Sequence, residues 1–139
     1  MLDSPVVERL IDEMRTVAVV GLSDKVTRPS FGVARYLRDR GVRIVPVNPR
    51  LAGSTVLGEL VYGSLLDIPR NIEVDIVDIF RRSELVPPVV DDAIARGDAK
   101  AIWMQQGVVN EEATARARAA GMTVVMDACL AVQHRLRSR

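Results

Sequence analysis

Five short apolar segments, separated by stretches with helical spacing, constrain the fold of this 139-residue chain more than any other feature. They occupy residues 17–20, 42–47, 74–79, 101–104 and 123–126. Three of the helical stretches end at a glycine, Gly41, Gly97 or Gly121, as helices often do. Strands that alternate with helices predict right-handed crossovers and a doubly wound parallel sheet of five strands, flanked by helices, with the order 3-2-1-4-5.

The composition agrees with a buried parallel sheet. Hydrophobic residues make up 48% of the chain and aromatic residues only 4%, as expected where aliphatic strands are covered on both faces. A chain of this length fits one domain, so we predict a single domain over residues 1–139. A further helix is expected after Ser4-Pro5 and a short basic one over residues 130–139, whereas residues 51–69 predict a loop and one short helix.

Charge and the scarcity of cysteine and histidine exclude several classes of function. The 19 basic and 18 acidic residues are interspersed, so nothing favours a nucleic acid or a membrane as partner. The apolar runs are too short to span a bilayer and the N-terminus lacks the pattern of a secretion signal, so we expect a cytoplasmic protein. One cysteine, Cys129, and one histidine, His134, leave no internal disulfide and no support for a metal site.

Polar residues follow each predicted strand. In open parallel sheets, ligands bind beyond the carboxyl ends of the strands, where the strand order reverses. The segments at these ends are 21–30, 48–50, 80–84, 105–107 and 127–129. Any one of them can be a plain turn, in which Gly21 only permits the turn and Ser30 only caps the next helix. Five such segments at one edge favour a binding site.

The first of these loops has the composition of a phosphate-binding turn. Gly21 allows close backbone approach, Ser23 offers a hydroxyl group, and the helix after Ser30 presents unpaired N–H groups. Lys25 and Arg28 add two positive charges. Together these groups suit a pyrophosphate.

The same loop departs from the fingerprint of nicotinamide dinucleotide sites. The second and third glycines of G-x-G-x-x-G are missing, and the second strand ends in Asn48-Pro49 where an acidic residue would bind a ribose 2′-hydroxyl. NAD is therefore disfavoured. Arg81 and Arg82 after the third strand would suit a ligand with a further phosphate, although arginines that open a helix also occur without one.

Ordered motifs cover almost the whole chain: VAVVGLSDKVTRPSFGVARYL at 17–37, IVPVNP at 44–49, VDIVDIFRRSE at 74–84, IWMQQGVVNEEA at 102–113 and VVMDACL at 124–130. In these motifs the chain resembles the small single-domain CoA-binding proteins. That family is similar to the CoA-binding domain of succinyl-CoA synthetase α subunits and of ADP-forming acyl-CoA synthetases. Ordered motifs at successive strand ends are more specific than a lone glycine motif.

The resemblance implies a Rossmann-like domain that binds coenzyme A, or an acyl-CoA, at the carboxyl ends of the strands. The pyrophosphate and its surroundings would meet Gly21, Ser23, Lys25, Arg28 and Ser30. The adenosine side would be formed by Asn48 and Pro49, the middle by Phe80, Arg81 and Arg82, and the surroundings of the pantetheine arm by Gln105 and Gly107.

The chain departs from the family after Cys129. Family members often carry a Lys and a Glu between the positions of Cys129 and His134, where this chain has Leu-Ala-Val-Gln, so no role of that pair carries over. Cys129 is either a small packing residue or a thiol beside that of bound CoA, where a mixed disulfide can form. His134 is best explained as a helix residue with a satisfied ring.

Catalysis is not expected from this chain. A synthetase of the kind it resembles needs an ATP-binding module and, in the diphosphate-forming class, a phosphorylated histidine on a further domain, and no G-x-S-x-G hydrolase motif occurs. We expect a non-catalytic CoA-binding protein, regulatory or accessory, with a homodimer or a ligase subunit as partner. Two alternatives stay open: an NAD(H)-binding oxidoreductase or redox sensor, and an interaction module with a decayed nucleotide site.

Overall fold

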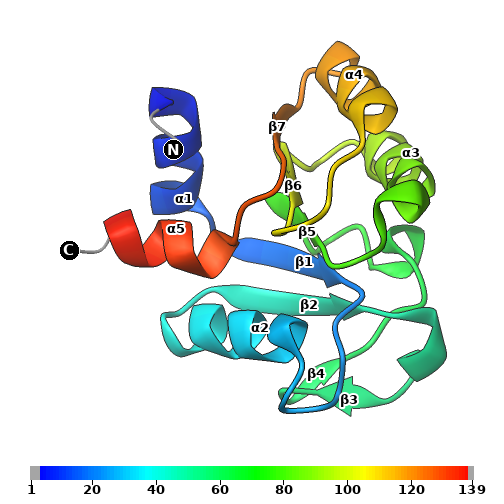
Figure 1. Cartoon of the computed structure of the whole chain (residues 1–139). Helices are drawn as coiled ribbons and strands as arrows, with labels where there is room; N and C mark the ends of the chain where they lie inside the picture. The colour runs from blue at the N-terminus through cyan, green and yellow to red at the C-terminus, as the bar shows by residue number, and fades with distance from the viewer. Residues whose placement is uncertain (1–3, 138–139) are drawn as a thin grey trace.

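Five parallel strands form the central sheet of the computed structural model, which describes residues 4–137 (Figure 1). In chain order they are β1 (Thr16–Val20), β2 (Arg43–Val47), β5 (Ile76–Ile79), β6 (Ala101–Met104) and β7 (Thr123–Val125). Their order across the sheet is β2-β1-β5-β6-β7. The predicted α/β fold with a five-stranded parallel sheet flanked by helices is confirmed.

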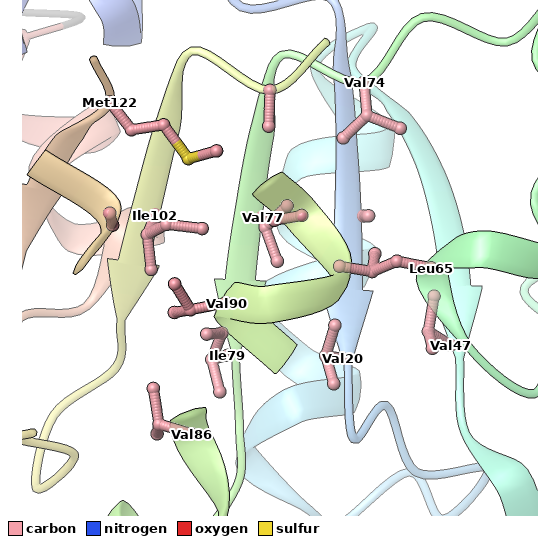
Figure 2. Close-up of a cluster of buried hydrophobic side chains, with 14 of the residues drawn as sticks. Val20, Val47, Leu65, Val74, Val77, Ile79, Val86, Val90, Ile102 and Met122 are labelled. Carbon is pink, nitrogen blue, oxygen red and sulfur yellow. The ribbon is translucent and has the colours of Figure 1, made fainter. Parts of the chain in front are cut away.

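Helices cover both faces of this sheet. One face carries α1 (Pro5–Glu13), α2 (Pro29–Asp39) and α5 (Leu130–Arg137), and the other carries α3 (Val86–Arg96) and α4 (Glu111–Ala119). Alternate strand residues serve opposite faces, so within β5 Ile76 packs in the first layer and Val77 in the second. Figure 2 shows the second layer, where Val90 of α3 lies close to Ile102 of β6 and Ile79 of β5. Because both faces are covered, the strands are almost entirely buried.

The predicted strand order 3-2-1-4-5 is wrong. β5, the third strand of the sheet along the chain, pairs with β1 and not with β2, so the order is 2-1-3-4-5 and β2 lies at the edge. Pro46 supplies a physical reason, because proline has no N–H for a neighbouring strand and is confined to sheet edges. Its carbonyl accepts a hydrogen bond from the Tyr62 N–H at 3.0 Å, whereas the next carbonyl, that of Val47, accepts one from Gly21 at the end of β1.

A long connection joins β2 to β5. It contains two short 3-10 helices, η1 (Pro49–Leu51) and η2 (Leu65–Asp67), and an antiparallel pair of two-residue strands, β3 (Thr55–Val56) and β4 (Glu59–Leu60). The sequence predicted a loop and one short helix here and missed the hairpin. Its turn holds Leu57 at a φ of 54° next to Gly58, and this left-handed conformation is uncommon for leucine, so the residue types concealed the turn.

Arg96 ties this connection to α3. Its guanidinium group, in a residue only 5% exposed, donates hydrogen bonds to four backbone carbonyls within residues 65–72. It also pairs with Asp98, at 3.1 Å from Nε to Oδ1. A buried guanidinium group is tolerated when its N–H groups all find acceptors. η2 is therefore held firmly against α3.

The helix ends follow the signals in the sequence. Ser4 Oγ accepts a hydrogen bond from the Val7 N–H at 3.4 Å, and Pro5 is the first residue of α1. The three glycines predicted to end helices have φ values of 85° to 90°. The predicted C-terminal helix is present as α5, and residues 138–139 lie outside the described range. Within residues 4–137 no helix has the length and apolar character needed to cross a membrane.

Candidate functional site

The direction of winding changes between β1 and β5. α2, which follows β1, lies on one face of the sheet, and α3, which follows β5, lies on the other. Such a change opens a crevice at the carboxyl ends of the two strands, which is where open parallel sheets bind ligands. Two cavities flank this crevice, one on each face: a cation-lined cavity of about 730 Å³ and an apolar cavity of about 250 Å³.

The cation-lined cavity lies on the α2 face. It is lined by Gly21, Ser23, Asp24, Lys25, Arg28, Pro29, Ser30, Val33, Asn48, Arg50, Leu51, Phe80, Gln105, Gln106, Val108 and Cys129. These residues come from the segments that follow all five strands and from the N-terminal half of α2. Its volume is within the range of about 300–1,000 Å³ that is usual for small-molecule and cofactor sites.

Gly21 begins the loop after β1, at a φ of 87°. A Cβ atom at this position would lie 2.2 Å from the carbonyl oxygen of Phe80, a distance that no side chain tolerates. The glycine is thus required by the close approach of the β1 and β5 ends, whether or not a ligand is bound. The sequence interpretation, which gave Gly21 to the ligand, did not foresee this neighbour.

Side-chain hydroxyl groups hold the loop in shape. Ser30 Oγ accepts a hydrogen bond from the Ser23 N–H at 3.0 Å, and Ser23 Oγ accepts one from the Lys25 N–H at 3.0 Å. α2 begins at Pro29, with Arg28 as the capping residue and no side-chain cap. The alternative in which Ser30 only caps the helix is therefore wrong, because its buried hydroxyl folds the loop back against the helix start.

Three cationic side chains, from Lys25, Arg28 and Arg50, line this cavity, against a single acidic one, from Asp24. No ion pair joins any of the three cations to another residue within the described range 4–137. Arg50 follows Asn48, whose side chain accepts a hydrogen bond from the Arg50 N–H at 3.0 Å and donates one to the Leu22 carbonyl at 3.0 Å. Asn48 therefore joins the β2 end to the first loop, and the surplus positive charge suits an anionic ligand.

The far end of the cavity is formed by Phe80, Gln105 and Cys129. Gln105 is buried, and its Oε1 accepts a hydrogen bond from the N–H of Leu130, the first residue of α5, at 3.1 Å. Cys129 is partly buried at the same helix start. This end carries no cationic side chain among its lining residues, so the cavity changes from charged to neutral along the edge of the sheet.

The apolar cavity lies on the α3 face of the same edge. It is lined by Val20, Val47, Pro49, Gly63, Ser64, Leu65, Arg81, Leu85, Pro88, Val89 and Asp92. Its polar side chains are those of Ser64, Arg81 and Asp92. Partial burial, together with the neighbouring charges of Asp91 and Asp67, raises the pKa of Asp92 above its usual value.

The structure separates the twelve residues predicted for the site into three groups. Eight line the cation-lined cavity: Gly21, Ser23, Lys25, Arg28, Ser30, Asn48, Phe80 and Gln105. Pro49 and Arg81 line the apolar cavity on the opposite face. Arg82 lines neither and lies 4.0 Å from Glu84 in an exposed pair. Gly107 lines neither, although its chain neighbours Gln106 and Val108 line the cation-lined cavity. Its N–H donates a hydrogen bond to Asp127 Oδ1 at 2.7 Å.

Some lining residues lay beyond the reach of the sequence interpretation. Arg50 and Gln106 stood in the strand-end segments and were not assigned to the ligand, and Cys129 was left open between a packing residue and a thiol beside that of CoA. Val33, Leu51 and Val108 carried no signal that distinguished them from core residues. Only the packing of α2, η1 and the β6 end around one space brings them together.

His134 of α5 lines neither cavity, and its ring faces Tyr36 of α2. Its Nδ1 is 3.0 Å from the Tyr36 hydroxyl group, and the two rings meet edge to face. Partial burial and the nearby charge of Arg40 lower the pKa of His134. In the described part of the chain, no group of three or more His, Cys, Asp and Glu side chains is arranged to hold a metal ion.

Asp78 is a feature that sequence reasoning missed. It lies in β5 between Val19 and Trp103, fully buried, and neither carboxyl oxygen has a hydrogen-bond partner within the described residues. Its burial raises the pKa well above the usual value, so the neutral form is favoured. Its cross-strand neighbours Val19 and Trp103 pack in the layer under α2, so the Asp78 side chain lies on the same face of the sheet as the cation-lined cavity.

Comparisons with known proteins agree with this geometry. A protein-family model described as a CoA binding domain matches residues 15–135. Uncharacterized protein YneT of Bacillus subtilis (strain 168) is 41% identical over 128 residues, which are 92% of this chain and 91% of YneT. Acetate–CoA ligase (ADP-forming) II of Archaeoglobus fulgidus is 30% identical over 99 residues, or 70% of this chain and 14% of the ligase.

Solved structures show the same fold. Cell-free ID.343 from Thermus thermophilus has a TM-score of 0.89 and 34% identity to this chain, with 95% of this chain and 96% of that one covered. Both chains are thus matched almost from end to end, so the likeness extends over the β2–β5 connection as well as over the sheet.

Proposed function

The chain belongs to the CoA binding domain family, and from that premise we propose that it binds coenzyme A, or an acyl-CoA, in the cation-lined cavity as a non-catalytic regulatory or accessory protein. The single observation that carries the proposal is the position of Lys25, Arg28 and Arg50. These cations line one end of a cofactor-sized cavity and pair with no other described residue. A pyrophosphate would supply the missing negative charge.

The ligand would lie along the cavity, with its phosphates at the cationic end and its uncharged arm at the neutral end. The phosphates would lie against Ser23, Lys25 and Arg28, at the first turn of α2, where the helix N-terminus also favours an anion. The pantetheine arm would extend past Phe80 towards Gln105 and Cys129. Its amide groups would there meet the Gln105 side chain and backbone groups of the β6 end.

A binding role is supported by the ligase relative, because only one segment of that enzyme resembles this chain. This chain corresponds to 14% of the Archaeoglobus fulgidus ligase, so most of that enzyme has no counterpart in the aligned region. We therefore assign ligand presentation or sensing to this chain, with a ligase subunit or a second copy as the partner.

Calorimetric titration of the ligand-free protein with CoA, dephospho-CoA and NADH tests the proposal, after mass spectrometry has excluded co-purified ligand. We expect CoA to bind more tightly than NADH by at least about tenfold, which corresponds to about 1.4 kcal/mol. Weaker binding of dephospho-CoA would assign a role to the third phosphate. Stronger binding of NADH would favour the oxidoreductase, and no binding of any ligand would favour the interaction module.

A further inference from the structure

Cys129, the single cysteine of the sequence, lines the cation-lined cavity at its neutral end. The residue is only partly buried, so it is accessible from the cavity. The proposed function brings the pantetheine arm of the ligand, which ends in a thiol, to this same end. Two sulfur atoms then lie at one end of the cavity, in the arrangement that thiol–disulfide exchange requires.

Two buried side chains from β6 and the segment after it fix the backbone on both sides of Cys129. Trp103 Nε1 donates a hydrogen bond to the Ala128 carbonyl at 2.9 Å, and Gln105 Oε1 accepts one from the Leu130 N–H at 3.1 Å. The exposed fractions of Trp103 and Gln105 are 0% and 4%. Cys129 is therefore held at one place on the cavity wall.

Gln105 also carries a hydrogen-bond donor that no described residue satisfies. Its Oε1 binds the Leu130 N–H, whereas its Nε2 has no partner within residues 4–137. Among these residues, the fully enclosed side-chain atoms without a partner belong to Asp78 and Arg116, so Gln105 Nε2 reaches the open space of the cavity. A buried donor left unpaired costs free energy. The space next to Cys129 is thus suited to a hydrogen-bond acceptor.

The last amide group of pantetheine supplies such an acceptor. Its carbonyl group is separated from the thiol by the amide nitrogen and two methylene groups. Gln105 is itself hydrogen-bonded to the residue that follows Cys129. A hydrogen bond from Gln105 Nε2 to this carbonyl oxygen therefore brings the ligand sulfur to the Cys129 side chain.

Building on the proposed function, we propose that Cys129 exchanges with the disulfide form of the ligand and holds one CoA as a mixed disulfide, with Gln105 positioning the ligand sulfur. The Cys129 thiolate attacks one sulfur of CoA disulfide, a bond forms between Cys129 Sγ and that sulfur, and the bond between the two ligand sulfurs breaks. The second CoA leaves as a thiolate and takes up a proton. CoA disulfide is itself the oxidant, so Cys129 is oxidised and one CoA is reduced.

The mixed disulfide has no route of release within the chain. A second cysteine beside the first would displace the ligand by forming an internal disulfide, and the sequence contains none. The captured CoA therefore stays in the cavity until an external thiol reduces the bond. Cys129 is thereby a site of reversible covalent modification by the ligand.

The first experiment compares CoA disulfide with pantethine, the disulfide of pantetheine, by intact-mass spectrometry in the absence of oxygen. The two compounds share the reacting end, but pantethine has no phosphates for the cationic end of the cavity. CoA disulfide should form the adduct at least about tenfold faster, because binding turns the exchange into a step within one complex. Dithiothreitol should remove the adduct. Equal rates, or a dimer linked through Cys129 in place of the adduct, would overturn the inference.

The second experiment locates the captured CoA. The purified adduct should bind no further CoA in calorimetric titration, because its own CoA fills the cavity, and reduction should restore binding. An adduct that binds CoA as tightly as the unmodified protein does would place the attached CoA outside the cavity and overturn the inference alone. Failure of CoA to bind the unmodified protein would instead overturn the proposed function, and the inference with it.

The third experiment tests Gln105. Gln105→Glu keeps an acceptor for the Leu130 N–H and loses the Nε2 donor, so its rate with CoA disulfide should fall about tenfold. Its rate with hydroxyethyl disulfide, which has no amide group, should equal that of the wild type. Gln133→Glu, on α5 and outside both cavities, is the matched control. An unchanged ratio of the two rates in Gln105→Glu would overturn the role of Gln105, whether both rates fell or neither did.

Discussion

The two cavities share three strand ends and differ in how their walls are assembled. The charged groups of the cation-lined cavity come largely from one stretch, residues 23–30, so they are close in sequence as well as in space. The apolar cavity combines residues 20, 47, 49 and 63–65 with five residues from the segment 81–92, which only the tertiary structure brings together. The charged site can thus be recognised in the sequence as a local motif, whereas the apolar site depends on how distant segments pack.

The largest effect is expected where the two cavities meet. Gly21→Ala should lower the free energy of unfolding by at least about 5 kcal/mol, the upper part of the combined range for backbone strain and overpacking, because the added Cβ meets the rigid carbonyl of Phe80. Gly107→Ala is the matched control: its φ of 85° is similar, and no other atom lies within 4 Å of the added Cβ. Urea denaturation measures both. Equal losses would show that backbone strain alone accounts for the effect and that the Phe80 carbonyl yields to the added Cβ.

Arg96 provides a test of the apolar cavity alone, because it holds the backbone of Leu65, which lines that cavity. Arg96→Met should lower the free energy of unfolding by about 3–5 kcal/mol, because four backbone carbonyls and Asp98 lose a buried partner. Thermal or urea denaturation measures the change. Arg118→Met, exposed on α4, should change stability by no more than about 0.5 kcal/mol. A similarly small change in Arg96→Met would mean that η2 holds its place without this clamp.

A smaller effect is expected from single charges of the cation-lined cavity. Lys25→Ala or Arg28→Ala should weaken CoA about tenfold or more, the worth of one hydrogen bond between charged groups, and should leave pantetheine, which has no phosphate, unchanged. Arg82→Ala is the control, because Arg82 lines neither cavity. Calorimetry decides the question. Equal loss for CoA and pantetheine would place the phosphates elsewhere.

An effect that depends on pH is expected at Asp78. Because its pKa is raised in the folded state, wild-type stability is fully present below the ordinary value of 3.8 and falls as the pH rises towards the folded-state pKa. Asp78→Asn removes this proton linkage. The free energy of unfolding of the variant should therefore gain on that of the wild type as the pH rises from 4 to 8. A difference independent of pH would show that the Asp78 carboxyl finds a partner in solution.

Sequence reasoning predicted the fold class, the cavity at the carboxyl edge of the sheet and the lining by the first loop. It failed on the strand order and on which face of the sheet Pro49 and Arg81 line. The five apolar segments needed only their periodicity to be recognised. Pro46 favours a position of β2 at the edge of the sheet, which leaves the place beside β1 to β5. In the sequence, this proline indicates an edge strand but does not say which strand pairs with β1. Pro49 and Arg81 were assigned to one site with Asn48 and Phe80, whereas the pleat turns these neighbours to opposite faces.

Two buried ionisable side chains, those of Arg96 and Asp78, show the same limit of sequence reasoning. Arg96 and Asp78 look like ordinary polar residues in the sequence, because burial and the presence or absence of a partner are properties of the packed chain. In the structure, Arg96 has acceptors for its guanidinium group while Asp78 has none among the described residues. No local pattern distinguishes these two outcomes.

The sequence by itself determined that the polar segments gather at one edge, because parallel strands joined by crossovers bring all their carboxyl ends to the same side. It also determined the charge of the first loop, since those residues are chain neighbours. Only the tertiary structure decided that this edge carries two cavities, one charged and one apolar. Which face a strand-end side chain takes, and which distant segment meets it there, depends on strand pairing and on the direction of each crossover.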